Sequence, residues 1–134
     1  MGQFFSDPVE QALEYIYYDL CVGKGDQGMQ LLETASFYDD GDASCVLAHC
    51  LRGRLYVWTG HRFPKDDNRA RKLLYKSVLQ GSALGMLMAM RSGELRDWLQ
   101  DEMSSVRLQE SFDIVLKKAE GGEPFCQYVI GNFY

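Results

Sequence analysis

One helix face recurs along this chain at a spacing of 42 residues, and this recurrence constrains the fold more than any other feature. Small and apolar residues fill offsets 0, 3, 4 and 7 three times: Gly28, Leu31, Leu32 and Ala35; Ala70, Leu73, Leu74 and Ser77; and Phe112, Val115, Leu116 and Ala119. These offsets place four side chains on one side of an α-helix. An isolated amphipathic helix shows the pattern once, whereas its return at a fixed interval indicates a helical repeat protein.

Glycines stand just beyond these helices, at Gly41, at Gly81 and at Gly121 with Gly122. Glycine is the usual residue in the left-handed conformation that ends a helix. A further apolar segment follows each glycine, so we expect the repeating unit to be a helical hairpin. Strand signals are nearly absent, because no stretch alternates apolar and polar residues between turn dipeptides.

The length predicts one domain that covers residues 1–134. With 134 residues, 46% of them hydrophobic, the chain can bury a core without disulfides or metals. We predict an all-α solenoid of about three helix-turn-helix repeats plus a terminal half repeat. Asp66 or Asp67 is the predicted N-cap of the fourth helix. The expected helices span residues 8–22, 27–38, 42–58, 67–80, 82–92, a short stretch within 94–103, 105–120, and 124 to the end.

Charge is distributed unevenly along the chain, whose net charge is −5. Residues 1–51 hold nine acidic residues and one basic residue, residues 52–76 hold eight basic and two acidic residues, and residues 77–134 hold eight acidic and five basic residues. The middle is therefore a basic stripe between acidic ends. Neighbouring helices could neutralise each other, or the charged faces could form a docking surface. The sequence leaves both interpretations open.

The residues that usually carry catalysis or bind metals form no recognisable motif. Cys21, Cys45, Cys50 and Cys126 lie in apolar segments without Cys-x-x-Cys spacing, which favours buried free thiols in a reducing cytoplasm. His49 follows Cys45 by four residues, but two ligands do not make a metal site. Phosphate loops and dinucleotide-binding motifs are absent. We therefore expect no cofactor, no metal and no enzymatic activity.

A family resemblance lies in the middle of the chain. Residues 60–70 read Gly-His-Arg-Phe-Pro-Lys-Asp-Asp-Asn-Arg-Ala, and residues 73–83 read Leu-Leu-Tyr-Lys-Ser-Val-Leu-Gln-Gly-Ser-Ala. This ungapped stretch resembles the Sel-one-like repeat, a relative of the tetratricopeptide repeat. Residues 24–43 and 112–134 are similar to the second half of the same pattern.

The resemblance implies a right-handed superhelix of antiparallel helix pairs, whose concave surface binds proteins. It also implies that the domain has no enzymatic activity of its own. The sequence departs from the family pattern at Arg62, where the family usually has glycine, and in residues 94–111, which lack the Gly-Val-x-x-Asp loop. We therefore expect an irregular third hairpin around Trp98.

These observations predict a non-catalytic protein-binding module, such as an adaptor, or an immunity or inhibitor protein with one partner. Tyrosine, tryptophan and arginine dominate the binding energy of many interfaces. The acidic residues within 1–51 would speed association with a basic partner. The predicted partner-binding residues are Tyr15, Tyr18, Asp39, Asp40, Asp42, Arg52, Tyr56, Trp58 and Trp98.

Two other partners stay open. The basic stripe 52–76 could bind nucleic acid, although a pI of about 5.0 argues against it. The chain ends at Phe133 and Tyr134 within an expected hairpin helix, so its open C-terminal end could pair with a second copy as a homodimer. No window approaches the roughly 18 apolar residues of a membrane span, so we expect a cytoplasmic protein without membrane contact.

Overall fold

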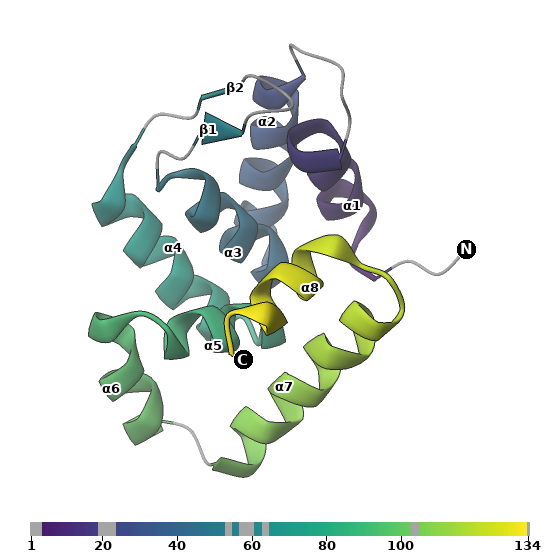
Figure 1. Cartoon of the computed structure of the whole chain (residues 1–134). Helices are drawn as coiled ribbons and strands as arrows, with labels where there is room; N and C mark the ends of the chain where they lie inside the picture. The colour runs from purple at the N-terminus through teal and green to yellow at the C-terminus, as the bar shows by residue number, and fades with distance from the viewer. Residues whose placement is uncertain are drawn as a thin grey trace.

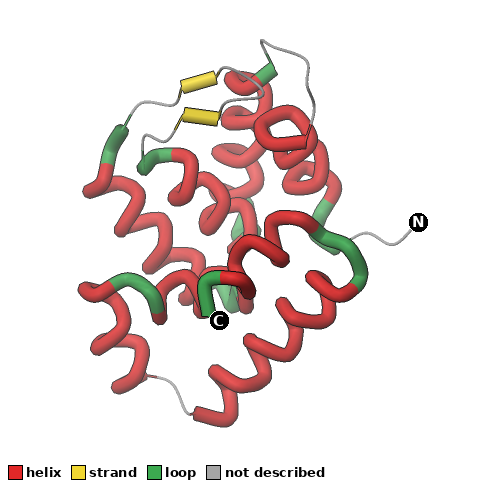
Figure 2. The backbone as a smooth tube through the Cα atoms, viewed as in Figure 1, coloured by secondary structure: helices red, strands yellow, loops and turns green. Residues whose placement is uncertain are grey.

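The computed structural model describes residues 4–18, 24–52, 55–56, 61–62, 65–102 and 105–133. This part of the chain is almost wholly helical (Figures 1 and 2), which confirms the predicted all-α class. Its elements are α1 (Asp7–Leu13), a π-helical turn η1 (Glu14–Tyr18), α2 (Gly25–Phe37), α3 (Gly41–Cys50), β1 (Leu55–Tyr56), β2 (His61–Arg62), α4 (Asp67–Leu79), α5 (Ala83–Met90), α6 (Gly93–Glu102), α7 (Ser105–Glu120) and α8 (Pro124–Gly131).

The predicted third helix is too long, because α3 ends at Cys50 and two short strands follow it. β1 and β2 pair antiparallel, with Leu55 opposite Arg62 and Tyr56 opposite His61. Figure 2 shows this pair at the end of the molecule near α2 and α3. Aromatic and β-branched residues in the segment favour extended backbone, and glycine disfavours a helix interior. Strands of two residues are too short to show the alternation of apolar and polar residues by which longer strands are predicted.

Three helix pairs recur at nearly the interval seen in the sequence. The first helices α2 and α4 have 13 residues each, and their first residues, Gly25 and Asp67, lie 42 positions apart. The second helices α3, α5 and α8 begin at Gly41, Ala83 and Pro124, at intervals of 42 and 41 residues. In the three pairs α2–α3, α4–α5 and α7–α8, the two helices pack against each other.

The turn inside each pair has one shared backbone conformation. Its left-handed residue is Asp39 with φ 69°, Gly81 with φ 86° or Gly122 with φ 103°. In all three turns the next backbone N–H donates to the carbonyl five residues earlier, which is the Schellman pattern. The prediction of glycine caps is therefore confirmed at Gly81 and Gly122. It is wrong at Gly41, which begins α3, because Asp39 takes the left-handed conformation there.

The residue after each left-handed position caps the second helix of its pair. Side-chain oxygens of Asp40, Ser82 and Glu123 accept the backbone N–H three residues later, at 3.2, 3.0 and 2.7 Å. Such caps satisfy amide groups that would otherwise lack partners at the start of a helix. Asp66 caps α4 in the same way, which confirms that prediction.

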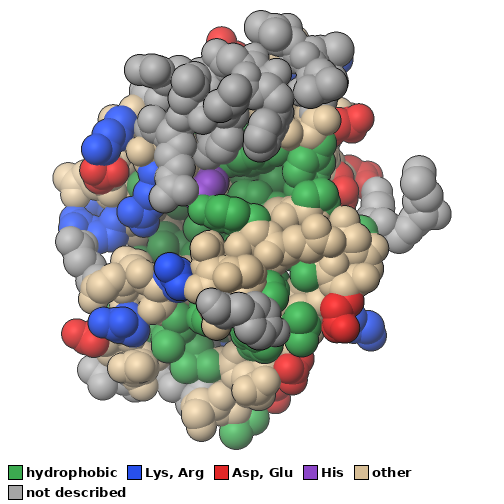
Figure 3. Space-filling model, viewed as in Figure 1, with side chains coloured by type: hydrophobic (Ala, Val, Ile, Leu, Met, Phe, Trp, Pro, Cys, Tyr) green, Lys and Arg blue, Asp and Glu red, His purple; other side chains and the backbone are tan. Residues whose placement is uncertain are grey.

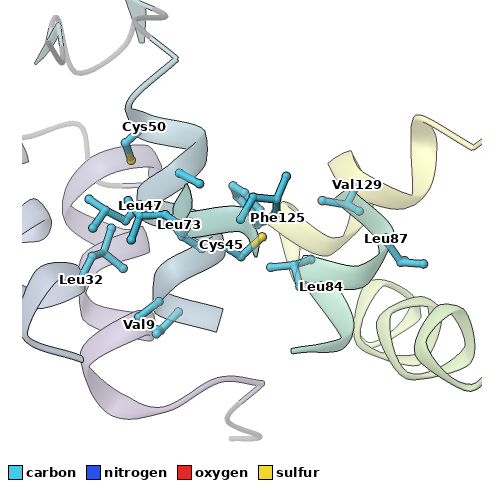
Figure 4. Packing of buried hydrophobic residues seen from close by; sticks show 14 of the residues in the cluster. Val9, Leu32, Cys45, Leu47, Cys50, Leu73, Leu84, Leu87, Phe125 and Val129 are labelled. Carbon is cyan, nitrogen blue, oxygen red and sulfur yellow. The ribbon is translucent and has the colours of Figure 1, made fainter. Parts of the chain in front are cut away.

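α3 lies at the centre of the molecule. It packs against α2, α4 and α5, and every residue from Ala43 to Cys50 is buried. A helix that is apolar on all sides suits such a position. Figure 4 shows Cys45 and Leu47 of α3 between side chains of the N-terminal helices and side chains of α5 and α8. The buried side chains form a single hydrophobic cluster that extends from α1 to α8.

The N-terminal elements also contact α7 and α8. The ring of Tyr17 lies 5.6 Å from the ring of Phe125 of α8, and Nζ of Lys118 of α7 lies 4.7 Å from the ring of Phe5. Phe125, Cys126, Val129 and Ile130 of α8 are buried. Pairing with a second copy through the C-terminal end stays a prediction.

Candidate functional site

Two adjoining cavities form one cleft between α3, α4, α5 and α8, which we call the basic cleft. The cavities have volumes of about 480 and 750 Å³, and Arg52, Arg91 and Ser92 line both. The smaller cavity is also lined by His49, Leu74, Met88, Tyr128, Val129 and Asn132, and the larger by Asp67, Asn68, Arg71 and Gly93. Figure 3 shows this face of the molecule, with Lys and Arg side chains gathered over α4 and α5 beside α8.

Three exposed arginines from different helices line the basic cleft. Arg52 follows Leu51, the C-cap of α3, and Arg91 is the C-cap of α5. Arg71 lies in the second turn of α4. The partial negative charge at a helix C-terminus stabilises a nearby cation, which accounts for arginine at two of these positions. Local helix chemistry therefore brings positive charge to the rim of the cleft.

The three arginines differ in the contacts that they make within the protein. The Arg91 guanidinium donates to the carbonyl oxygen of Asn132 and lies 6.0 Å from the ring of Phe133. Arg71 Nη2 donates to Asn68 Oδ1 at 2.8 Å. For the Arg52 guanidinium, no hydrogen bond or ion pair is found with the described part of the chain. Arg52 is the arginine most available to a ligand.

Apolar and aromatic side chains complete the lining of the smaller cavity. Leu74 and Val129 lie buried in its wall, Met88 is half-buried, and Tyr128 is 42% exposed. The His49 ring is buried, with its centre 5.4 Å from the ring of Tyr128 and 5.4 Å from that of Phe125. His49 therefore serves as part of an aromatic cluster in the wall. The cleft combines positive charge at its rim with an apolar wall.

Two of the three acidic residues predicted to dock a partner accept hydrogen bonds within the protein. Asp40 caps α3 and also accepts a hydrogen bond from the hydroxyl of Ser6. Asp42 accepts one from the Ser82 hydroxyl at 2.6 Å. Burial raises the pKa of the Asp42 carboxyl, although the Ser82 hydrogen bond opposes the shift. Asp39 is exposed at its left-handed position, so the predicted trio does not form one free acidic patch.

The predicted tyrosines have structural partners as well. The Tyr18 hydroxyl donates to Glu123 at 2.6 Å and accepts the backbone N–H of Phe125 at 3.0 Å. Burial and the hydrogen bond to Glu123 raise the pKa of Tyr18. Nζ of Lys24 lies 5.1 Å from the centre of the Tyr15 ring. Tyr18 thus links η1 to the start of α8. It does not line the basic cleft.

The predicted Trp98 does not line the basic cleft. Trp98 of α6 is half-buried, and its ring centre lies 4.4 Å from that of Tyr75 on α4. Trp58 and the side chain of Tyr56 lie outside the described residues, although the Tyr56 backbone belongs to β1. Among the predicted residues whose side chains are described, Arg52 lines the basic cleft, together with Arg71 and Arg91, which the sequence analysis did not select.

Arg71, Arg91 and Tyr128 were missed as site residues. Arg71 was counted in the basic stripe, but nothing in the sequence separated it from its neighbours. Arg91 follows the apolar helix 83–90. A basic residue at the C-terminus of a helix was the feature of the sequence that could have pointed to it. Tyr128 lies in the cleft because of how α8 packs, and no local sequence pattern predicts that packing.

The buried thiols have raised pKa values. Cys45, Cys50 and Cys126 are free and buried, as predicted, whereas Cys21 lies outside the described residues. Burial raises the pKa of Cys50 to about 12 and also raises the pKa values of the other two. Cys45 Sγ donates to Met88 Sδ at 3.2 Å. Because the thiolate is the nucleophile and the metal ligand, these thiols are poorly suited to either task at neutral pH.

Within the described ranges, no group of three or more His, Cys, Asp or Glu side chains is placed to hold a metal ion. No helix in the same ranges is both long and apolar enough to cross a membrane. Comparisons with protein-family models, with curated proteins and with solved structures find no match. The resemblance of residues 60–83 to the Sel-one-like repeat stays a prediction.

Proposed function

We propose that this chain is a non-catalytic module of the Sel-one-like kind, folded as a right-handed superhelix of helix pairs, that binds one partner protein in the cytoplasm. The observation that carries the proposal is the turn repeated in α2–α3, α4–α5 and α7–α8, with its left-handed residue and its N-cap. Stacked helix pairs joined by equivalent turns build extended surfaces that suit binding.

The chemistry of the candidate residues supports binding over catalysis. The three described thiols are buried with raised pKa values, and His49 is packed among aromatic rings. A nucleophilic thiol is activated when its pKa is lowered, whereas burial raises the pKa of each of these three thiols, and the neighbouring Glu123 carboxylate raises that of Cys126 further. Arginine, tyrosine and aliphatic side chains in one cleft are instead typical of an interface.

The availability of charged groups favours the basic cleft over the acidic turns as the contact surface. Asp40 and Asp42 are occupied by hydrogen bonds within the chain, whereas the Arg52 guanidinium is exposed. An adaptor or a specific inhibitor would use the surface whose charges are available. We therefore propose that the partner protein docks on the basic cleft.

The proposal is tested by affinity purification of the tagged protein, followed by size-exclusion chromatography of the protein mixed with each retained candidate. We expect one protein to co-elute in a defined ratio at physiological salt. Arg52→Glu serves as the cleft variant, and Lys117→Glu, on the exposed surface of α7, as the matched control. Absence of any stoichiometric partner, or capture of nucleic acid that nuclease treatment removes, would contradict the proposed function.

A further inference from the structure

The basic cleft carries a local positive charge in a protein whose net charge is −5. Arg52, Arg71 and Arg91 line it together with a single carboxylate among the described residues, Asp67. Asp67 Oδ2 already lies 3.6 Å from Nζ of Lys65. Arginines thus outnumber carboxylates in the described lining, and Arg52 has no partner among the described residues. A ligand with negative charge would be attracted to this part of the surface.

The shape of the cleft sets a second requirement. Met88, which is half-buried, and Tyr128, which is 42% exposed, offer apolar surface in the cavity of about 480 Å³ that Arg52 and Arg91 also line. An apolar side chain placed against them would leave water, which favours binding. A purely ionic ligand would not use this wall. The lining fits a ligand that carries acidic groups on both sides of an apolar group.

We infer that the basic cleft binds an acidic peptide segment of the partner protein, with carboxylates at Arg52, Arg71 and Arg91 and one aliphatic or aromatic side chain against Met88 and Tyr128. The inference rests on the proposed protein-binding function and names the part of the partner that is recognised. Arginine suits this task because its planar guanidinium can hold a carboxylate through two parallel hydrogen bonds.

A nucleic acid is the less suitable ligand, because it needs a row of cations that follows successive phosphates. Several basic side chains outside the cleft are engaged within the chain. Arg69 pairs with Glu33, Lys65 with Asp67, and Lys76 Nζ donates to Ser36 at 3.4 Å. Among the described residues of the basic stripe, these contacts leave fewer cations free to follow successive phosphates.

Fluorescence anisotropy with a labelled synthetic peptide tests the inference. The probe has one leucine flanked on each side by glutamates, and a peptide with lysines in place of the glutamates is the first control. A labelled oligothymidylate is the second. The protein variants are Arg52→Glu, Arg52→Lys and the control Lys117→Glu. Because Arg52 is exposed, its variants should fold, which circular dichroism checks.

We expect the acidic peptide to bind and the lysine peptide not to bind. Arg52→Glu should weaken binding about three- to tenfold, because an attraction becomes a repulsion at a partly exposed site. Arg52→Lys keeps the charge and should weaken it by less than about threefold, while Lys117→Glu should have no measurable effect. Rising salt should weaken binding of the wild type more than that of Arg52→Glu.

Three results would overturn the inference: no binding of the acidic peptide, equal binding by wild type and Arg52→Glu, or tighter binding of the oligothymidylate. The proposed function fails separately. If a stoichiometric partner is retained equally by Arg52→Glu and wild type, the chain remains a protein-binding module and the assignment of the cleft is wrong.

Discussion

The acidic residues of the turns and the arginines of the basic cleft differ in how far their charges are engaged within the protein. In the turns, the carboxylates of Asp40, Asp42 and Glu123, which we call the turn carboxylates, accept hydrogen bonds from helix starts or from neighbouring hydroxyls. In the cleft, arginines lie exposed at helix ends, and Arg52 has no partner among the described side chains. The turn carboxylates are engaged within the protein, whereas Arg52 remains available to a ligand in the described part of the chain.

This difference shows why counting charges along a sequence misleads. Residues 1–51 carry the strongest net charge of the chain, yet two of the three acids selected there as docking residues are satisfied internally. A charge contributes to recognition only if folding leaves it free to meet a partner. Substitutions in the turns should therefore change stability, and substitutions in the cleft should change binding.

The largest loss of stability is expected for Glu123→Ala. Glu123 is 2% exposed, caps α8 and accepts the Tyr18 hydroxyl, so its removal deletes a cap and leaves a partly buried hydroxyl without its acceptor. We expect a loss of about 2–3 kcal/mol in the free energy of unfolding, measured by urea denaturation. The exposed Glu120→Ala is the control. A loss no larger than that of the control would show that Glu123 is not structural.

Asp40→Ala should cost less, about 1–2 kcal/mol, because it removes the cap of α3 and the acceptor for Ser6. Asp40→Asn keeps an acceptor oxygen and should retain most of the stability. Urea denaturation of both variants gives the comparison. Equal losses for alanine and asparagine would mean that the negative charge, and not the hydrogen bond, is what matters.

Asp39→Gly should stabilise the protein by about 0.5–1 kcal/mol. Asp39 has φ 69°, in the region that Gly81 and Gly122 occupy in the other two turns. Glycine adopts this conformation without steric cost, although it also gains freedom in the unfolded chain. Thermal denaturation measures the net effect. A lower melting temperature for the variant would show that the aspartate side chain stabilises this turn.

Asp42→Asn should give a smaller effect that depends on pH. The pKa of Asp42 is raised in the folded protein, so its ionisation costs stability as pH rises above the ordinary aspartate value of about 3.9. Asparagine removes that cost and still accepts the Ser82 hydroxyl. We expect the variant to be more stable than wild type near neutral pH and equally stable at strongly acidic pH. A constant difference across pH would contradict this assignment.

The helices could be predicted because each has a regular signal of its own. The faces at Gly28, Ala70 and Phe112 lie on α2, α4 and α7, and glycine indicated the turns at Gly81 and Gly122. The first turn was misplaced because an aspartate, which tolerates the left-handed conformation less well than glycine, occupies it. Two-residue strands after α3 lie below the length at which a pattern can be recognised.

The candidate site could be predicted only in part. Arg52 was selected because it stands beside aromatic residues in a basic stretch, but its companions Arg91 and Tyr128 come from α5 and α8. Their meeting depends on how helix pairs stack, which periodicity within one helix does not encode. The same limit applies to Tyr18, whose bond to Glu123 spans 105 residues of sequence.

The most direct measurement is a ¹H–¹⁵N NMR titration of the protein with the acidic leucine peptide. Binding in the basic cleft predicts that chemical shift changes concentrate at Arg52, Arg71, Arg91, Ser92 and Tyr128, while the amides of Asp39, Asp40 and Asp42 stay unchanged. Changes centred on residues 39–42, or spread along α4 without Arg52 and Arg91, would contradict the division between structural acids and binding arginines.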